Sequence, residues 1–204
     1  MKKKYSSWIF VFGIIIIPLS VFSFVSWFEN KFHKLPVLYE NNDTNISFSL
    51  ANQNGQTVEE KTFQGKVVVV DFFFTHCPSI CPKMTTNLTS VRYAFKNDTN
   101  VVINSFSIDP ERDSIEALAV YAKRFNVTGG WNFLTGSKQS IYRVARKGFY
   151  ITATDGDGGP NDFIHSDQLV LVDKKGRIRG YYDGTDSSVM PQLINDIKQL
   201  KREN

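Results

Sequence analysis

Residues 66–82, with the sequence KVVVVDFFFTHCPSICP, decide the fold class of this chain and contain both of its cysteines. The run over residues 66–74 is rich in β-branched and aromatic side chains, which is typical of a central strand buried on both faces. A helix is predicted to follow and to continue to about residue 96. Cys77 and Cys81 therefore lie at the joint between the most hydrophobic strand and the next helix.

The two cysteines are four positions apart, so a helix would place both sulfurs on one face. A helix N-terminus stabilises negative charge, which lowers the pKa of a thiol and favours the thiolate. Two such thiolates bind a soft metal or exchange with a disulfide. The simpler alternatives are two buried cysteines that fill the core and a structural disulfide, but that disulfide would close only a very short loop and stabilise little.

The rest of the chain alternates between strand and helix patterns. Asn54-Gly55 predicts a hairpin turn after the first strand, and Asp113-Ser-Ile-Glu116 has the spacing of a capping box with Asp113 as the cap. The pattern predicts an α/β domain with a central mixed sheet flanked by helices. Strands are expected at 46–50, 66–74, 101–108, 149–153, 168–173 and 178–182, and further helices at 113–125, 138–147 and 187–202.

The positive charge of the chain is confined to its beginning. Lys and Arg number 24 against 20 Asp and Glu, a net charge of +4, but from residue 35 onward there are 19 of each. A nucleic-acid groove needs basic residues on the folded body, where successive phosphates can meet them. The neutral domain excludes that class of partner.

Residues 8–28, WIFVFGIIIIPLSVFSFVSWF, carry no charge and are long enough to cross the hydrocarbon core of a bilayer as a helix. A cleavable signal peptide is the alternative, but the uncharged run continues past a cut near residue 23. We therefore expect a cytoplasmic leader at 1–7, a single transmembrane helix at 8–28, a tether at 29–45 and a domain at 46–204. The domain is expected on the outer, periplasmic face of a bacterial cytoplasmic (inner) membrane.

Three histidines are candidates for completing a metal site. His33 lies in the predicted tether, and the side chain of His76 is expected to point away from the cysteines as a local hydrogen-bonding or packing residue. His165 follows a loop rich in Gly and Asp and directly precedes a strand. From spacing alone, an ordinary hydrogen-bonded side chain is the simpler interpretation of a single histidine.

The run FFFTHCPSICPKMTTNL, then Ser107-Ile-Asp-Pro-Glu-Arg-Asp113, Trp131 with Leu134-Thr-Gly136, and a histidine ahead of LVLVDKKGRIRGYYDG together resemble the Sco/SenC family of cytochrome c oxidase assembly proteins. The resemblance implies a thioredoxin-like fold. It also implies a copper ion, Cu(I) or Cu(II), bound by Cys77, Cys81 and His165, with Asp109 near the site. Thiolates select Cu(I), and an imidazole completes a site that Cu(II) also uses.

The family implies a metallochaperone that delivers copper to the CuA centre in subunit II of cytochrome c oxidase and receives it from an upstream copper donor. A thiol-disulfide oxidoreductase, with Cys77 and Cys81 as its redox-active catalytic pair, is the alternative, and a redox or copper sensor would use the same residues. Oxidoreductases of this fold carry C-x-x-C and a cis-proline before the facing strand. The longer spacing here, and Ile164-His165-Ser166 at that place, favour copper delivery.

Overall fold

The computed structural model describes residues 4–32, 34–40, 47–127, 129–151 and 166–203, and within the first helix it describes the side chains of residues 12–27 only. The chain divides into two units, Met1–Lys34 and Leu35–Asn204.

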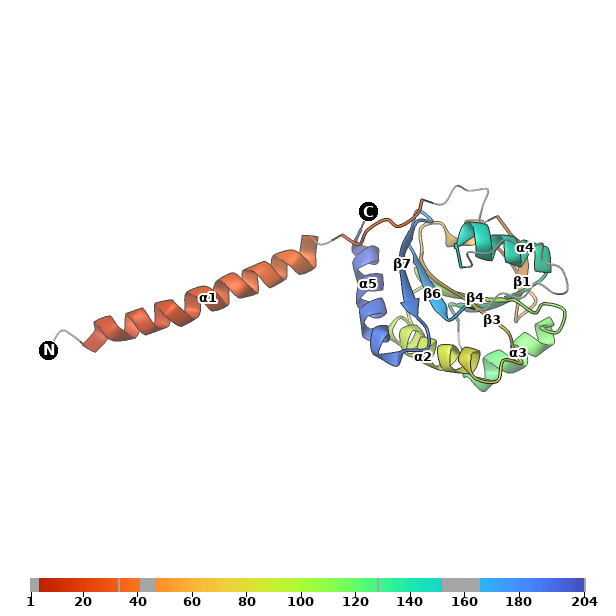
Figure 1. The fold of residues 1–204 in the computed structure, drawn as a ribbon, viewed down its shortest axis with the longest axis horizontal. Coiled ribbons are helices and arrows are strands. Elements are labelled where there is room, and N and C mark those ends of the chain that lie inside the picture. The colour runs from red at the N-terminus through yellow and green to blue at the C-terminus, as the bar shows by residue number, and fades with distance from the viewer. Residues whose placement is uncertain (1–3, 33, 41–46, 128, 152–165, 204) are drawn as a thin grey trace. The chain divides into compact units, whose positions relative to one another are not determined.

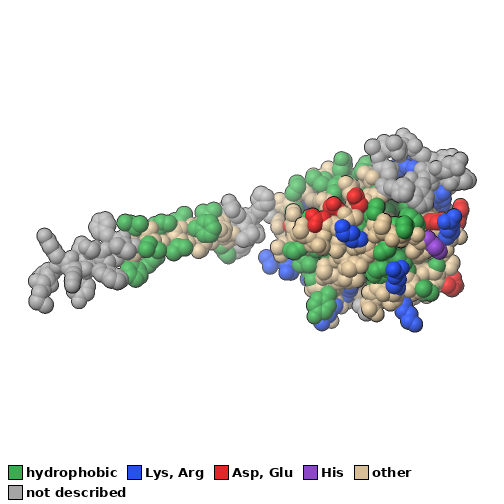
Figure 2. Space-filling view, turned by 60° about the horizontal axis from the view of Figure 1, so that its bottom comes forward, with side chains coloured by type: hydrophobic (Ala, Val, Ile, Leu, Met, Phe, Trp, Pro, Cys, Tyr) green, Lys and Arg blue, Asp and Glu red, His purple; other side chains and the backbone are tan. Residues whose placement is uncertain are grey.

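The N-terminal unit is one helix, α1 (Lys4–Phe32), with Pro18 in its interior. Apolar side chains cover its described part, and several are more than half exposed, among them Phe12, Ile14 and Phe22 (Figure 2). Across the part of the chain that the structure describes, no helix combines the length and the apolar character needed to cross a membrane. The side chains at 8–11 and at 28, which belong to the predicted anchor, lie outside the described residues.

A seven-stranded mixed sheet forms the centre of the second unit, in the order β2-β1-β5-β4-β3-β6-β7 (Figure 1). β3 pairs in parallel with β4 and antiparallel with β6, and every residue of β3 is buried. The predicted central strand is therefore confirmed. The strands are β1 (Ser49–Asn52), β2 (Thr57–Glu59), β3 (Val67–Phe73), β4 (Val101–Ser107), β5 (Trp131–Thr135), β6 (Gln168–Val172) and β7 (Ile178–Asp183).

Helices cover both faces of the sheet (Figure 1). α2 (Ile80–Ala94), α3 (Ile115–Arg124) and α5 (Met190–Arg202) pack on one face, and α4 (Lys138–Arg143) with the π-helical turn η2 (Val144–Gly148) packs on the other. Two short 3₁₀ turns, η1 (Glu60–Phe63) and η3 (Ser187–Val189), complete the described elements. This arrangement confirms the predicted α/β layers, which bury an apolar stripe of each helix against the sheet.

The prediction failed at three places. β5 was not expected, because a five-residue strand gives little periodic signal. Residues 149–151 do not form the predicted strand: Phe149 and Ile151 donate backbone hydrogen bonds back to η2, and Tyr150 has a positive φ of 53°. Residues 152 and 153 lie outside the described residues.

The third difference is the cap of α3, which is Ser114 and not Asp113. The Ser114 Oγ accepts a hydrogen bond of 3.2 Å from the Ala117 N–H. Asp113 is fully buried and bonds elsewhere. A carboxylate that already accepts tertiary hydrogen bonds is not available for the helix N-terminus, and the neighbouring hydroxyl takes that place.

Residues 35–39 lie within the range predicted as a tether, and here they form a strap along β7. The Leu38 N–H donates to the Ile178 carbonyl at 2.9 Å, and the Ile178 N–H donates to the Tyr39 carbonyl at 3.0 Å. The buried Arg179 guanidinium donates to the carbonyls of Leu35 and Pro36. The strap thereby occupies the backbone groups of Ile178 on an edge strand, which are otherwise open to pairing with another chain.

Candidate metal centre

The cysteine loop, residues 74–81, connects the end of β3 to the start of α2. The Cys77 N–H donates to the Phe74 carbonyl at 3.2 Å, which turns the chain toward the helix. The Cys81 N–H then donates to the Cys77 Sγ at 3.3 Å. The sulfur of Cys77 thus satisfies one of the free N–H groups at the helix N-terminus, while the Ser79 side chain makes no capping bond.

The two thiols are free of each other and differ in their surroundings. Cys77 is half-buried. Burial alone raises the pKa of Cys77, but the hydrogen bonds from the N–H groups of Cys81, Ser79 and Ile80 and from the Cys81 thiol outweigh it, so the pKa lies below its ordinary value. These donors stabilise the Cys77 thiolate, as expected for a sulfur at a helix N-terminus.

Cys81 has the opposite character. It is 5% exposed and packs in the core among residues of α2 and the sheet. Burial, followed by its hydrogen bond to Cys77, raises the pKa of Cys81 well above its ordinary range. The site therefore combines one thiolate-forming sulfur near the surface with one protonated sulfur beneath it.

Asp113 holds the cysteine loop from the side. Its carboxylate accepts hydrogen bonds from the Thr75 N–H at 3.1 Å, from the Thr75 hydroxyl at 2.5 Å and from the Ser107 hydroxyl at 2.6 Å. These bonds join the chain two residues before Cys77 to the end of β4. The capping-box spacing assigned Asp113 to the start of a helix, so this role was not predicted. The sequence did contain a usable signal for it, because Ser107 ends a buried strand and is followed closely by Asp109 and Asp113.

Asp109 was expected near the site through the family resemblance. Its carboxylate lies 3.8 Å from Arg112, and its backbone N–H donates to the Ser107 hydroxyl at 3.2 Å. Asp109 therefore borders the same Ser107 that bonds Asp113. The described contacts do not connect the Asp109 carboxylate to either cysteine.

Of the three histidines, His76 alone lies within the described residues. The His76 ring lies beside Thr75, with Nδ1 3.0 Å from the Thr75 Oγ, and its side chain is 65% exposed. The prediction that His76 is a local hydrogen-bonding residue is thus confirmed. His33 and His165 lie outside the described residues. Within the described ranges, no three His, Cys, Asp or Glu side chains gather into a metal site, so the assignment of His165 as third ligand stays a prediction.

Asp71 is an acidic residue of β3 for which the sequence analysis predicted no role. It interrupts the apolar run of β3 and is 1% exposed. Burial raises the pKa of Asp71 to about 7, although the hydrogen bond of 2.5 Å from the Ser105 hydroxyl offsets part of that rise. The Trp131 indole N–H donates to Ser105 at 2.9 Å, which extends this buried polar network from β3 across β4 to β5.

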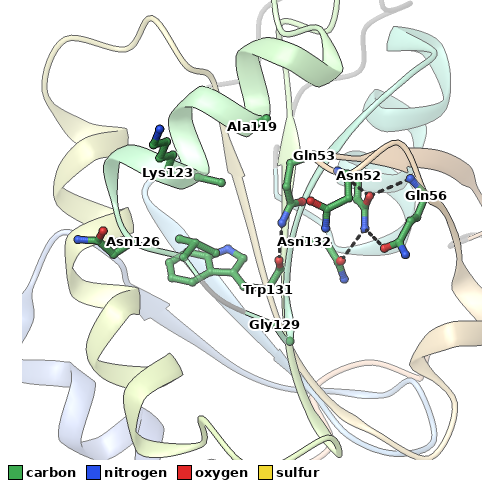
Figure 3. Close-up of a pocket in the computed structure, with 13 residues that line it drawn as sticks. Asn52, Gln53, Gln56, Ala119, Lys123, Asn126, Gly129, Trp131 and Asn132 are labelled. Atoms are coloured by element: carbon green, nitrogen blue, oxygen red, sulfur yellow. Dashed lines mark hydrogen bonds between the residues drawn. The ribbon is translucent and has the colours of Figure 1, made fainter.

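A polar pocket of about 570 Å³ lies between the β1–β2 hairpin, α3 and the loop before β5 (Figure 3). Its amide side chains bond one another and the backbone: the Asn52 side chain donates to the Asn132 side chain at 3.1 Å, and the Gln53 side chain donates to the Trp131 backbone carbonyl at 2.9 Å. These bonds join β1 to β5. The amides therefore stabilise the pairing of β1 with β5. Neither cysteine lines this pocket.

Comparison with known proteins places this geometry in a family. Residues 37–202 match the family model described as SCO1/SenC. The "SCO1 protein homolog" of Bacillus subtilis is 34% identical over 154 residues, which cover 74% of this chain and 79% of that protein.

Two solved structures are similar in fold as well as in sequence. One, titled as identifying a disulfide switch in BsSco, a member of the Sco family of cytochrome c oxidase assembly proteins, has a TM-score of 0.66 at 31% identity over 81% of this chain and 100% of that one. Arabidopsis thaliana ScoI with copper bound has a TM-score of 0.60 at 30% identity over 76% of this chain and 99% of that one. These likenesses confirm the expected fold of the domain.

Proposed function

This chain belongs to the SCO1/SenC family, and from that premise we propose that it is a copper metallochaperone whose Cys77, Cys81 and His165 bind the ion. Copper is the cargo of this site. Copper-bound relatives such as Arabidopsis thaliana ScoI support the choice of metal.

The observation that carries the proposal is the pair of free thiols at the N-terminus of α2. Thiolates are soft ligands that select Cu(I) among the common ions. The Cys77 sulfur is already stabilised as a thiolate by backbone N–H groups, and metal binding displaces the proton of Cys81. His165, which precedes β6, supplies the imidazole that completes the set.

The acceptor in this proposal is the CuA centre in subunit II of cytochrome c oxidase. The relative titled as a cytochrome c oxidase assembly protein supports that class of acceptor. Copper passes between proteins by ligand exchange, in which an acceptor thiolate or imidazole bonds the ion before a donor ligand leaves. A half-exposed Cys77 beside a buried Cys81 suits this order, because one ligand is reachable while the other retains the ion.

Copper titration of the full-length chain in detergent tests the site. We expect the reduced wild type to bind one Cu(I), and His165→Ala to weaken binding at least about tenfold and to change the Cu(II) spectrum. His33→Ala is the matched control, since it removes an imidazole from outside the domain. Unchanged copper affinity in His165→Ala would remove His165 from the site, and a wild type that binds no copper would remove the chaperone role.

We further propose that residues 8–28 anchor the chain as a single span in a bacterial cytoplasmic membrane, with the domain on the outer face. Its support is the uncharged run with Trp8 and Trp27 near its ends. Alkaline carbonate extraction of membranes, followed by protease treatment of intact spheroplasts, tests it. Release of the chain by carbonate, or protection of the domain from the protease, would contradict the proposed location.

A thiol-disulfide oxidoreductase is the second candidate, and the opposite pKa shifts of the two thiols favour it. The Cys77 thiolate would attack a target disulfide and form a mixed disulfide. Cys81, after losing its proton, would attack Cys77 Sγ and release the target as a dithiol, so that two electrons pass to the target and a Cys77–Cys81 disulfide remains. Fast turnover on a disulfide substrate with negligible copper affinity would reverse our ranking.

A further inference from the structure

A pocket lined by lysines lies at the end of the domain opposite the cysteine loop. It has a volume of about 610 Å³ and lies between the loop after α2 and the C-terminal part of α5. Its polar lining consists largely of ammonium, amide and hydroxyl groups, from Lys96, Lys198, Lys201, Asn97, Asn100 and Thr99. Asp98 also lines it and is paired with Lys201. Lys96 and Lys198 are exposed, and neither pairs with an acidic side chain among the residues that the structure describes.

The ends of the two helices do not account for these lysines. Cations near a helix C-terminus often compensate the partial negative charge of its last carbonyl groups. Here other side chains do so: Arg92 donates to the Lys96 carbonyl at 2.7 Å, and Lys174 donates to the carbonyls of Lys201 and Glu203 at 2.9 and 2.7 Å. The ammonium groups of Lys96 and Lys198 are therefore available to an anionic ligand.

Tyr93 adds an aromatic ring to this pocket. It is 72% exposed, and the Lys96 Nζ lies 4.8 Å from the centroid of its ring. Tyrosines are enriched where a membrane meets water, because the ring is apolar and the hydroxyl is polar. A tyrosine beside lysines therefore suits the headgroup layer of a bilayer.

The strap begins at the same end of the domain. Arg179 donates to the carbonyls of Leu35 and Pro36 and pairs with Glu203 at 2.8 Å, close in sequence to Lys201. The proposed span ends at residue 28, so at most about 25 Å of extended chain separates it from Leu35. A bilayer that holds the span is therefore within reach of the pocket.

We propose that this pocket binds the phosphate headgroup of an anionic phospholipid, so that the lysines and Tyr93 dock this end of the domain on the bilayer. The inference rests on the proposed membrane anchor. β3 begins at this end, where the Val67 N–H donates to the Asn100 carbonyl at 2.9 Å, and it runs about 20 Å before the cysteine loop follows. Docking therefore directs the cysteine loop away from the bilayer, where an acceptor domain in water can reach it.

Hydrogen exchange of the full-length chain in lipid nanodiscs tests the proposal. The discs consist of phosphatidylcholine alone or of phosphatidylcholine mixed with phosphatidylglycerol, and mass spectrometry follows the peptides that cover residues 93–100. We expect exchange there to slow at least about threefold in the discs with phosphatidylglycerol. High salt should remove the difference, because it screens exposed charges.

Two double variants locate the effect. Lys96→Gln with Lys198→Gln should abolish the slowing, and it leaves the backbone bond to the Lys96 carbonyl in place. Lys123→Gln with Lys147→Gln is the matched control, since it removes the same charge from two exposed lysines on α3 and η2, and it should retain the slowing. Equal loss in both double variants would show a general attraction of the domain to anionic lipid and would overturn the pocket.

The remaining outcomes separate this proposal from the proposed function. Equal exchange in both kinds of disc, for a chain that resists carbonate extraction, would overturn the lipid site and leave the anchor intact. Equal slowing by inorganic phosphate in discs of phosphatidylcholine alone would identify a site for free phosphate and overturn the lipid as its ligand. Release of the chain by carbonate would overturn the anchor and this inference together, while the copper titration decides the chaperone role independently.

Discussion

The cysteine loop and the strap are two irregular segments that a buried aspartate holds in different ways. At the strap, Asp173 bonds two guanidinium groups: Arg177 Nε at 2.9 Å and Nη2 at 2.8 Å, and Arg179 Nη1 at 2.8 Å. At the cysteine loop, Asp113 is bonded by two hydroxyls and a backbone N–H. Charge-assisted hydrogen bonds between two charged groups are the stronger kind, so the joint at the strap is held more tightly than the joint at the cysteine loop.

The pKa of a buried carboxylate in this domain depends on which groups donate hydrogen bonds to it. Burial tends to raise the pKa of Asp173, but the hydrogen bonds from Arg177 and Arg179 outweigh it and hold the pKa below its ordinary value. Asp71, with one hydroxyl donor and no described cation, has a pKa raised to about 7. Buried carboxylates in this domain thus differ in the pH range over which they contribute to stability.

Removal of the Asp173 carboxylate should have the largest effect on stability. Asp173→Ala leaves the buried Arg179 without one of its two acidic partners, Glu203 being the other, and we expect a loss of about 3 to 5 kcal/mol in the free energy of unfolding. Urea denaturation measures it. The alkylation rate of Cys77 should not change, and a change there would contradict the separation of the two regions.

Asp71 should give stability an unusual pH dependence. Its folded-state pKa of about 7 lies above the value of 3.8 for the unfolded chain, so its contribution is fully present below about pH 4 and is lost as the pH rises toward 7. The loss is at most on the order of 4 kcal/mol, from about 1.4 kcal/mol per pKa unit. Denaturation of wild type and Asp71→Asn at pH 5 and pH 8 measures this loss. An equal change in the free energy of unfolding between the two pH values in both proteins would contradict the raised pKa of Asp71.

Asp113→Ala should cost less stability and change the thiols more. The hydroxyls of Thr75 and Ser107 and the Thr75 N–H lose their acceptor, which we expect to cost about 1 to 3 kcal/mol. The cysteine loop should loosen, so that Cys81 becomes open to iodoacetamide under native conditions. Asp173→Ala is the matched control, and protection of Cys81 in Asp113→Ala would show that the loop does not depend on this carboxylate.

The smallest predicted effect is a difference in reactivity between the two thiols of the wild-type protein. Because backbone N–H groups lower the pKa of Cys77 and burial raises that of Cys81, iodoacetamide should label Cys77 first at neutral pH. The labelling rate should rise with pH through a midpoint below that of an unperturbed thiol. Peptide mapping by mass spectrometry identifies the labelled residue, and equal labelling of both thiols would contradict the asymmetry.

Periodicity and short-range chemistry were enough to predict much of this domain. The apolar run of β3, the Asn54-Gly55 hairpin and the helix α2 after it were all predicted, because each depends on side chains near one another in sequence. β5 and the end of η2 were missed, because their conformations depend on the elements packed against them. The role of Asp113 was missed for the same reason, since its partner Thr75 lies 38 residues away.

The sequence by itself determined the central strand, the position of both thiols at the start of α2, and the confinement of excess charge to the first 34 residues. These are local properties of composition and spacing. Only the tertiary structure decided which thiol is stabilised as a thiolate, which carboxylate supports the cysteine loop, and which side chain the His76 ring contacts. Burial and hydrogen-bond geometry set those properties, and both arise only when distant segments pack together.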